Sequence, residues 1–127
     1  MTDLLHQWEQ AYKKGLLTFW ILLSLSERPM YAYEMREKIM ESSRGSIVAD
    51  ENSIYRALKR FADSGIVTSQ MKPSNIGPER KYFELSSIGS ELLHQFIQRN
   101  IAVLQDKTVV MAINKFQKTN HKERTKS

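Results

Sequence analysis

The sequence predicts a mainly α-helical fold of the α+β class, a winged helix-turn-helix with an N-terminal helix before it and a long helix after it. Three observations predict this fold. An amphipathic helix spans about residues 50–65, a two-stranded hairpin follows it directly, and another helix precedes it after a short connection. Two helices joined by a short turn form a helix-turn-helix, and a hairpin after the second helix is its wing.

The first helix is expected from about Leu4 to Ser26. Its second half is the longest apolar run of the chain, G-L-L-T-F-W-I-L-L-S-L at 15–25, which is too short to span a membrane and carries Thr18 and Ser24. No cleavage signal accompanies the run, so it does not resemble a signal peptide, and no membrane partner is expected. We expect Trp20, inside this run, to pack in the core or at a dimer interface, or to line a pocket for an aromatic effector.

The second helix is expected from about Met30 to Ser42. Pro29 would open it, Ala32, Met35 and Ile39 share one face, and S-S-R-G-S at 42–46 ends it.

The helix at 50–65 has one apolar face and one polar face. The apolar stripe, at i, i+3, i+4 and i+7, consists of Ile54, Ala57, Leu58 and Phe61. The opposite face carries Asn52, Arg56, Lys59, Arg60 and Asp63. Asp50 is a good N-cap, and Gly65 supplies the left-handed stop. The polar face could either be solvated or bind a partner. Because this helix stands between another helix and a hairpin, a binding partner is favoured.

The hairpin alternates from Ile66 to Met71, turns at a Pro/Ser/Asn/Gly/Pro cluster at 73–78, and returns through Lys81, Phe83 and Leu85. Its basic residues Lys72, Arg80 and Lys81 lie near the tip. Local cations of this kind are what a phosphate-binding face needs.

Ser86 is expected to cap a last helix over about 87–114. Two adjacent apolar stripes run along it, too wide to leave in water, and so long a helix favours a second copy of the chain as partner. The residues expected at this homodimer interface are Leu92, Leu93, Phe96, Ile97, Val103, Leu104, Val110 and Ile113, together with Trp20.

The formal net charge of +5 is mostly a property of the C-terminal end. Residues 115–127 hold five basic residues against Glu123, a net charge of +4, which leaves +1 for the rest. We therefore expect residues 1–86 to form the winged helix-turn-helix domain, 87–114 a dimerisation helix, and 115–127 a basic, disordered tail that could add nonspecific attraction to phosphate.

Several function classes find no support in the sequence. Cysteine is absent, so disulfides and thiol metal sites are excluded, and a cytoplasmic setting fits. His6, His94 and His121 share no ligand spacing, so no metal or other cofactor is expected. No phosphate-cradling glycine loop or Ser/His/Asp arrangement with a recognisable motif is present, so we expect no enzyme.

Three motifs resemble those of the PadR-type transcriptional regulators: M-Y-A-Y-E-M at 30–35, S-I-Y-R-A-L-K-R-F-A-D-S-G-I-V at 53–67 and G-P-E-R-K-Y-F-E-L-S-S-I-G at 77–89. The resemblance covers about Leu16 to Gly89, and the single C-terminal helix is similar to the short subgroup of that family. It implies a dimeric winged-helix regulator, usually a repressor of its own or a neighbouring gene, with DNA contact carried over to Tyr55, Arg80 and Lys81. Ala32 and Glu51 stand where the family usually has Gly and Pro.

The partners expected are therefore double-stranded DNA with a palindromic operator and a second copy of the chain, and a small-molecule effector is an option that the sequence leaves open. The residues expected to bind DNA are Tyr33, Asn52, Ser53, Tyr55, Arg56, Lys59, Lys72, Arg80 and Lys81. The alternative is a winged helix that docks proteins and does not bind DNA.

Overall fold

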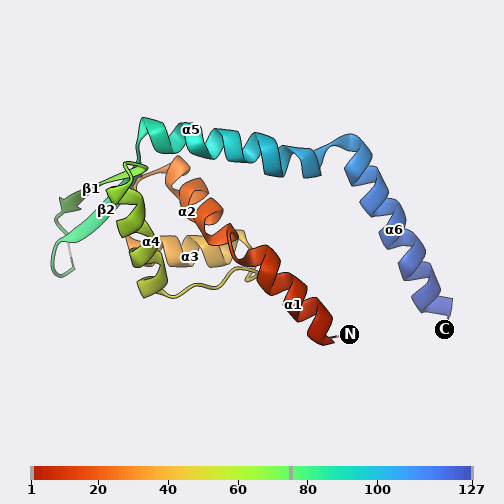
Figure 1. Cartoon of the computed structure of the whole chain (residues 1–127). Coiled ribbons are helices and arrows are strands. Elements are labelled where there is room, and N and C mark those ends of the chain that lie inside the picture. The colour runs from red at the N-terminus through yellow and green to blue at the C-terminus, as the bar shows by residue number, and fades with distance from the viewer. Residues whose placement is uncertain (1, 75, 127) are drawn as a thin grey trace. The chain divides into compact units, whose positions relative to one another are not determined.

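The computed structural model of the protein describes residues 2–74 and 76–126, with side chains described as far as Asn120. Asn75 of the expected turn and Ser127 of the expected tail lie outside the described residues. The elements in chain order are α1 (Thr2–Lys13), α2 (Leu16–Glu27), α3 (Ala32–Ser42), α4 (Glu51–Asp63), β1 (Val67–Lys72), β2 (Arg80–Leu85), α5 (Ser87–Phe96), η1 (Ile97–Ile101), η2 (Ala102–Gln105) and α6 (Lys107–Lys126) (Figure 1). The chain divides into two compact units, of which the first ends at Leu93 and the second begins at His94.

The first unit is built around one apolar core between α2, α3, α4 and the hairpin (Figure 1). Its largest fully buried side chains come from all of these parts: Ile21, Met30, Met35, Ile39, Ile54, Leu58, Val67 and Phe83. Two helices joined by a short connection are followed by an antiparallel hairpin, which is the winged helix-turn-helix that the sequence predicts.

α4 has the ends that its own residues predict. The Asp50 carboxylate accepts a hydrogen bond of 2.6 Å from the backbone N–H of Ser53, which makes Asp50 the N-cap. Gly65, just past the helix, has a φ of +78°, a conformation that favours glycine. The predicted apolar stripe is buried, with at most 8% of any of its four residues exposed.

The N-terminal region contains two helices where the sequence predicted one from Leu4 to Ser26. α1 ends at Lys13, a turn follows at Lys14 and Gly15, and α2 begins at Leu16. Glycine costs a helix interior about 1 kcal/mol relative to alanine. Packing does not offset this cost in α1, which has no buried residue. The local preference of Gly15 therefore ends the helix.

α3 begins at Ala32, two residues later than the sequence predicted. Met30, expected to be helical, is extended and pairs with Phe83 of β2: the Met30 N–H donates to the Phe83 carbonyl at 3.1 Å and the Phe83 N–H to the Met30 carbonyl at 2.8 Å. Tyr31 is the N-cap, and its backbone N–H donates to the Glu34 carboxylate at 3.3 Å. The paired backbone at Met30 and the cap at Tyr31 together place the start of the helix.

The wing is the predicted antiparallel hairpin. Its register runs from Val67 opposite Leu85 to Lys72 opposite Arg80. Because Met30 pairs with Phe83, the segment before α3 lies along β2 and joins the wing to the helix-turn-helix.

Ser86 joins the start of α5 to the corner between α4 and β1. Its hydroxyl accepts a hydrogen bond from the Gly89 N–H at 3.0 Å, as the predicted cap requires, and donates to the Gly65 carbonyl at 2.6 Å. At Gly89 the two segments approach so closely that a Cβ atom would collide with the carbonyl oxygen of Ile66.

The predicted continuous helix over 87–114 was wrong. α5 ends at Phe96, a π-helical turn (η1) and a 3-10 turn (η2) follow, and Asp106 is extended with a ψ of 139°. Asp106 caps α6, because its carboxylate accepts a hydrogen bond of 3.0 Å from the Thr108 N–H. The stripes predicted for a uniform α-helix do not hold here, because π and 3-10 turns rotate each residue by a different angle.

α6 continues to Lys126, so the segment expected as a disordered tail from residue 115 is helical through residue 126. Among the helices that the structure describes, none is both long and apolar enough to cross a bilayer.

Candidate nucleic-acid interface

The first two turns of α4 present polar side chains away from the core. Asn52, Tyr55, Arg56 and Lys59 are exposed, and Ser53 is half-buried. The Arg56 guanidinium donates a hydrogen bond of 3.2 Å to the Ser53 hydroxyl, so its side chain lies back along the helix toward the N-terminus. This end of α4 therefore offers amide, hydroxyl and guanidinium groups on one surface.

The three wing cations lie over aromatic rings. The guanidinium carbon of Arg80 is 4.5 Å from the centre of the Tyr31 ring, the Lys72 ammonium is 5.1 Å from that of Tyr82, and the Lys81 ammonium is 5.8 Å from that of Phe83. Within residues 2–74 and 76–120, no carboxylate lies within ion-pair distance of these three cations. A ring attracts a cation without cancelling its charge. The wing thus holds its cations in place and leaves them available to an anion.

These rings belong to a tyrosine cluster between α3 and the wing. Tyr31 stacks on Tyr33, with ring centres 6.5 Å apart, and meets Tyr82 edge-on at 5.3 Å. Tyr55 of α4 meets Phe83 edge-on at 6.3 Å. Tyr33 and Tyr55 were expected at the site, whereas Tyr31 and Tyr82 were not among the expected residues. The signal for Tyr82 was its position two residues after Arg80, on the same face of a strand.

One cleft brings four of the expected residues together. It has a volume of about 380 Å³ and lies where α3, α4 and the wing meet. The expected residues that line it are Tyr33, Tyr55, Arg80 and Lys81, and the others are Tyr31, Ala32, Glu51, Pro78 and Phe83. Tyrosine side chains and two cations around one opening form a surface that suits a phosphate.

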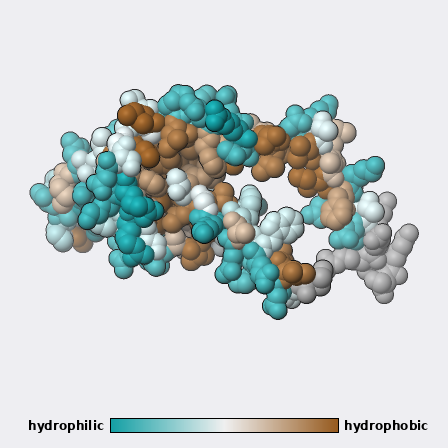
Figure 2. Space-filling view, viewed as in Figure 1, coloured by the Kyte–Doolittle hydropathy of each residue, from teal (hydrophilic) through white to brown (hydrophobic). Residues whose placement is uncertain are grey.

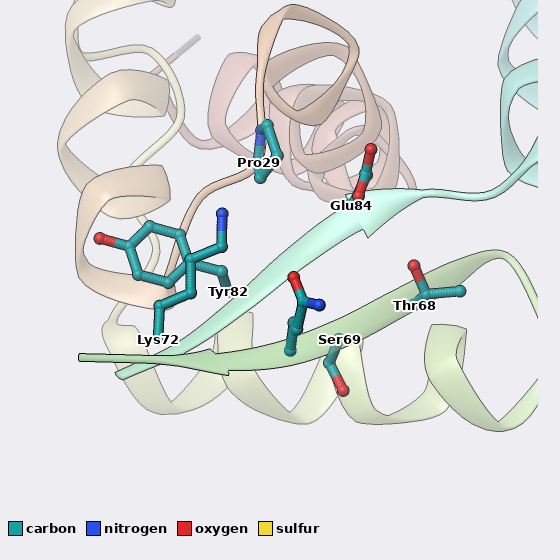
Figure 3. Close-up of a pocket in the computed structure, with 7 residues that line it drawn as sticks. Pro29, Thr68, Ser69, Lys72, Tyr82 and Glu84 are labelled. Carbon is teal, nitrogen blue, oxygen red and sulfur yellow. The ribbon is translucent and has the colours of Figure 1, made fainter. Parts of the chain in front are cut away.

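Lys72 lies at a different opening. A groove of about 280 Å³ along the hairpin is lined by Lys72, Tyr82, Pro29 and Glu84, with Thr68, Ser69 and Gln70 from β1 (Figure 3). Figure 3 shows the Lys72 side chain alongside the Tyr82 ring. The wing therefore presents cations at two openings.

Two carboxylates stand at the N-terminus of α4, Asp50 and Glu51. The Ser53 N–H that donates to the Asp50 carboxylate lowers the pKa of this group, and the Ser53 hydroxyl and the charge of Arg56 lower it further. Asp50 is therefore an ionised cap. Glu51 lines the large cleft and brings a negative charge to it.

The residues expected at a dimer interface differ in how exposed they are. Leu93 is 6% exposed and belongs to the core, and Trp20 is half-buried against Phe19, with ring centres 5.6 Å apart. Ile97 is half-buried, and the remaining expected residues are exposed: Leu92, Phe96, Val103, Leu104, Val110 and Ile113. α1 exposes further large apolar side chains: Leu4, Leu5, Trp8 and Tyr12. Figure 2 shows hydrophobic surface at the N-terminal end of α1 and along the segment after α5.

The described part of the chain holds no group of three or more His, Asp or Glu side chains arranged for a metal ion.

Comparison with known proteins shows which family has this architecture. Residues 21–95, more than half of the chain, match the model of the transcriptional regulator PadR-like family. A PadR-like transcriptional regulator from Bacillus cereus is 30% identical, with a TM-score of 0.62 over 83% of this chain and 94% of that one. A Streptococcus transcriptional regulator is also 30% identical, with a TM-score of 0.63 over 80% of this chain and 94% of that one.

Bacillus subtilis PadR, solved in complex with operator DNA, shares the fold with a TM-score of 0.60 and 24% identity. The match covers 65% of this chain but only 46% of that protein, so the chain spans less than half of its length. The family match includes α3, α4 and the wing, the parts that build the interface described above, together with the second half of α2 and nearly all of α5. The chain belongs to the PadR-like family of transcriptional regulators, which are not enzymes.

Proposed function

We propose that the protein binds duplex DNA in a sequence-specific manner and acts as a homodimeric repressor of its own or a neighbouring gene. The observation that carries the proposal is the cleft in which Tyr33, Tyr55, Arg80 and Lys81 converge beside the polar first turns of α4. In proteins of this architecture the second helix enters the major groove, and its first turns contact base edges. A regulator of this kind works where the chromosome is, so the proposal also assigns the protein to the cytoplasm.

In this proposal α4 recognises the base sequence of the DNA. Asn52, Ser53 and Arg56 lie in its first two turns, and amide and guanidinium groups match the edges of adenine and guanine. Tyr33, Tyr55 and Lys59 would hold phosphates and fix the angle at which α4 enters the groove.

The wing would contact the DNA independently of its base sequence. Arg80 and Lys81 have no carboxylate within ion-pair distance in the described residues, and their cation–π contacts orient them. Lys72, which pairs with Arg80 across the hairpin, would reach phosphate or the minor groove as well.

The homodimer follows from exposed apolar surface. Leu5, Trp8 and Tyr12 of α1 are each more than half exposed, and Val103, Leu104 and Ile113 of the second unit are about half exposed. Apolar side chains in such number are usually covered by a partner. Two copies would present two α4 helices to the two halves of a palindromic operator.

A small aromatic effector that releases the DNA belongs to the same proposal. An apolar hollow of about 290 Å³ on α1 is lined by Leu5, Trp8, Glu9 and Tyr12. The homodimer would cover the same side chains, so a flat apolar molecule bound there would compete with the second copy of the chain and alter the fluorescence of Trp8.

The test starts from the DNA upstream of the protein's own gene, searched for an inverted repeat and used in a mobility-shift titration beside a random duplex. We expect tighter binding to the repeat. Arg56→Ala should weaken binding to the repeat by roughly 1–3 kcal/mol and to the random duplex by much less, because a base contact is lost.

A double substitution of Arg80 and Lys81 by Ala supplies the matching comparison. It should weaken both duplexes similarly and lower the salt dependence by about one unit for each lost phosphate contact. If wild-type protein shifts neither duplex at low salt, the chain does not bind DNA and protein docking replaces the proposal. Equal losses on both duplexes for Arg56→Ala would make Arg56 a phosphate contact.

A further inference from the structure

The net positive charge of the chain comes from α6. Residues 1–106 contain thirteen basic and thirteen acidic side chains, so their formal charge is zero. α6 contains six basic residues and Glu123, which gives it the whole formal charge of +5. The part of the chain before α6 therefore has local cations but no formal net charge that would attract a polyanion.

Four of the five lysines of α6 occupy positions that are spaced to share one side of the helix. Lys115, Lys118, Lys122 and Lys126 follow one another at intervals of three and four residues, the spacing that places residues on one face. Lys115 and Lys118 are exposed. Successive lysines are thus about 5–6 Å apart along the axis, in a row about 16 Å long. We call these four residues the lysine row.

The apolar residues of α6 are confined to its first half. Val109, Val110, Met111, Ile113 and Phe116 all precede Gln117, and residues 117–126 include no large apolar side chain. A helix that lies in a membrane surface needs apolar side chains opposite its charges along its length. The lysine row has them beside its first lysine only, so its chemistry fits phosphates in water better than a lipid surface.

We propose that the lysine row is a second DNA-binding surface, which contacts the phosphates of duplex DNA without regard to sequence and supplies most of the chain's long-range attraction for DNA. The inference rests on the proposed function, because it gives the same duplex a second contact. Cations that neutralise phosphates release counterions, so the affinity falls with salt by about 0.9 logarithmic units per contact. The row therefore contributes to the salt dependence on any duplex and leaves the choice of sequence to α4.

The test compares two triple variants of the full chain that lose the same charge. The first replaces Lys115, Lys118 and Lys122 by Gln. The second replaces Lys38, Arg44 and Arg99 by Gln, positions outside the proposed DNA-binding surfaces. Binding to a short random duplex is measured by fluorescence anisotropy over a range of salt concentrations, and circular dichroism checks that each variant keeps its helix content.

We expect the first variant to lower the salt dependence by about two to three units for each bound chain, with the preference for the operator over random DNA kept. The second variant should change the salt dependence by less than one unit. A third variant, with Arg in place of the same three lysines, should bind like the wild type because the charge is kept.

Three results would overturn the inference. In the first, both Gln variants lose the same salt dependence, which would mean that only net charge matters. In the second, the α6 variant binds like the wild type while the Arg80 and Lys81 double variant does not, so that the proposed function stands without this surface. In the third, vesicles of mixed phosphatidylcholine and phosphatidylglycerol bind the wild type but not the α6 variant, and DNA binding is unaltered. If the wild type binds no duplex at all, the proposed function fails first.

Discussion

At the scale of single residues, Asp50 links folding and recognition. Its carboxylate caps α4 through the Ser53 N–H, and this hydrogen bond lowers the pKa of the carboxyl group in the folded protein. A group whose pKa is depressed on folding stabilises the protein above its unfolded pKa, and this contribution is lost as the pH falls through the folded value.

Asp50→Asn separates the charge from the cap, because Asn caps a helix about as well as Asp. We expect the difference in Tm between wild type and variant to be present near neutral pH and to shrink as the pH falls below the ordinary carboxyl range. The variant should also bind DNA more tightly, since one negative charge leaves the end of α4. Thermal melts from neutral to acid pH and a duplex titration measure both, and a pH-independent difference would show that ionisation of Asp50 has no part in stability.

The residues that the sequence identified are those with a local chemical signal. Asp50 and Gly65 bound α4 through their own backbone preferences, and the stripe from Ile54 to Phe61 gave its buried face. The contact between Arg80 and Tyr31 joins positions almost fifty residues apart, and no local pattern predicts such a pair. The aromatic support of the wing cations therefore became visible only in the folded chain.

At the scale of elements, the start of α5 is fixed by a close approach to the corner between α4 and β1. Gly89→Ala places a Cβ atom against the Ile66 carbonyl oxygen, and backbone cannot move aside as a flexible side chain can. We expect the substitution to lower the free energy of unfolding by about 1–3 kcal/mol, the usual range for overpacking.

Gly15→Ala is the matched control for Gly89→Ala. Nothing lies within 4 Å of a Cβ atom at Gly15, whose φ is −97°. This substitution should be neutral or stabilise the protein by a few tenths of a kcal/mol, up to about 1. Urea denaturation of both variants measures the two effects, and equal stabilities would contradict the close approach at Gly89.

The sequence predicted elements well where packing and local preference agree, and failed where they compete. The apolar run at residues 15–25 favoured one helix from Leu4 to Ser26. The structure has two helices instead, because Gly15 disfavours a helix interior and α1 has no buried residue whose packing would offset that preference. In the same way Asp106 caps a new helix inside a stretch whose apolar periodicity predicted one helix. Apolar periodicity shows which residues can be buried, but it does not show whether they belong to one continuous helix.

At the scale of the whole molecule, the exposed apolar side chains of α1 predict the assembly. We expect a homodimer by sedimentation at micromolar concentration, and a monomer after Trp8→Glu, because a charge would then lie in the buried interface. Val48→Glu is the control, since Val48 is 75% exposed and lies outside α1 and the second unit. A monomeric wild type, or a Trp8→Glu variant that remains dimeric, would remove α1 from the interface.

The backbone pair between Met30 and Phe83 has a consequence for binding thermodynamics. A two-stranded hairpin alone is marginally stable in water, and a wing without further support would lose conformational entropy on meeting its ligand. Here two hydrogen bonds, of 3.1 and 2.8 Å, join the hairpin to the segment before α3. The wing is therefore largely ordered in the free protein. It loses less conformational entropy when it binds its ligand, and the free energy of binding is more favourable for that reason.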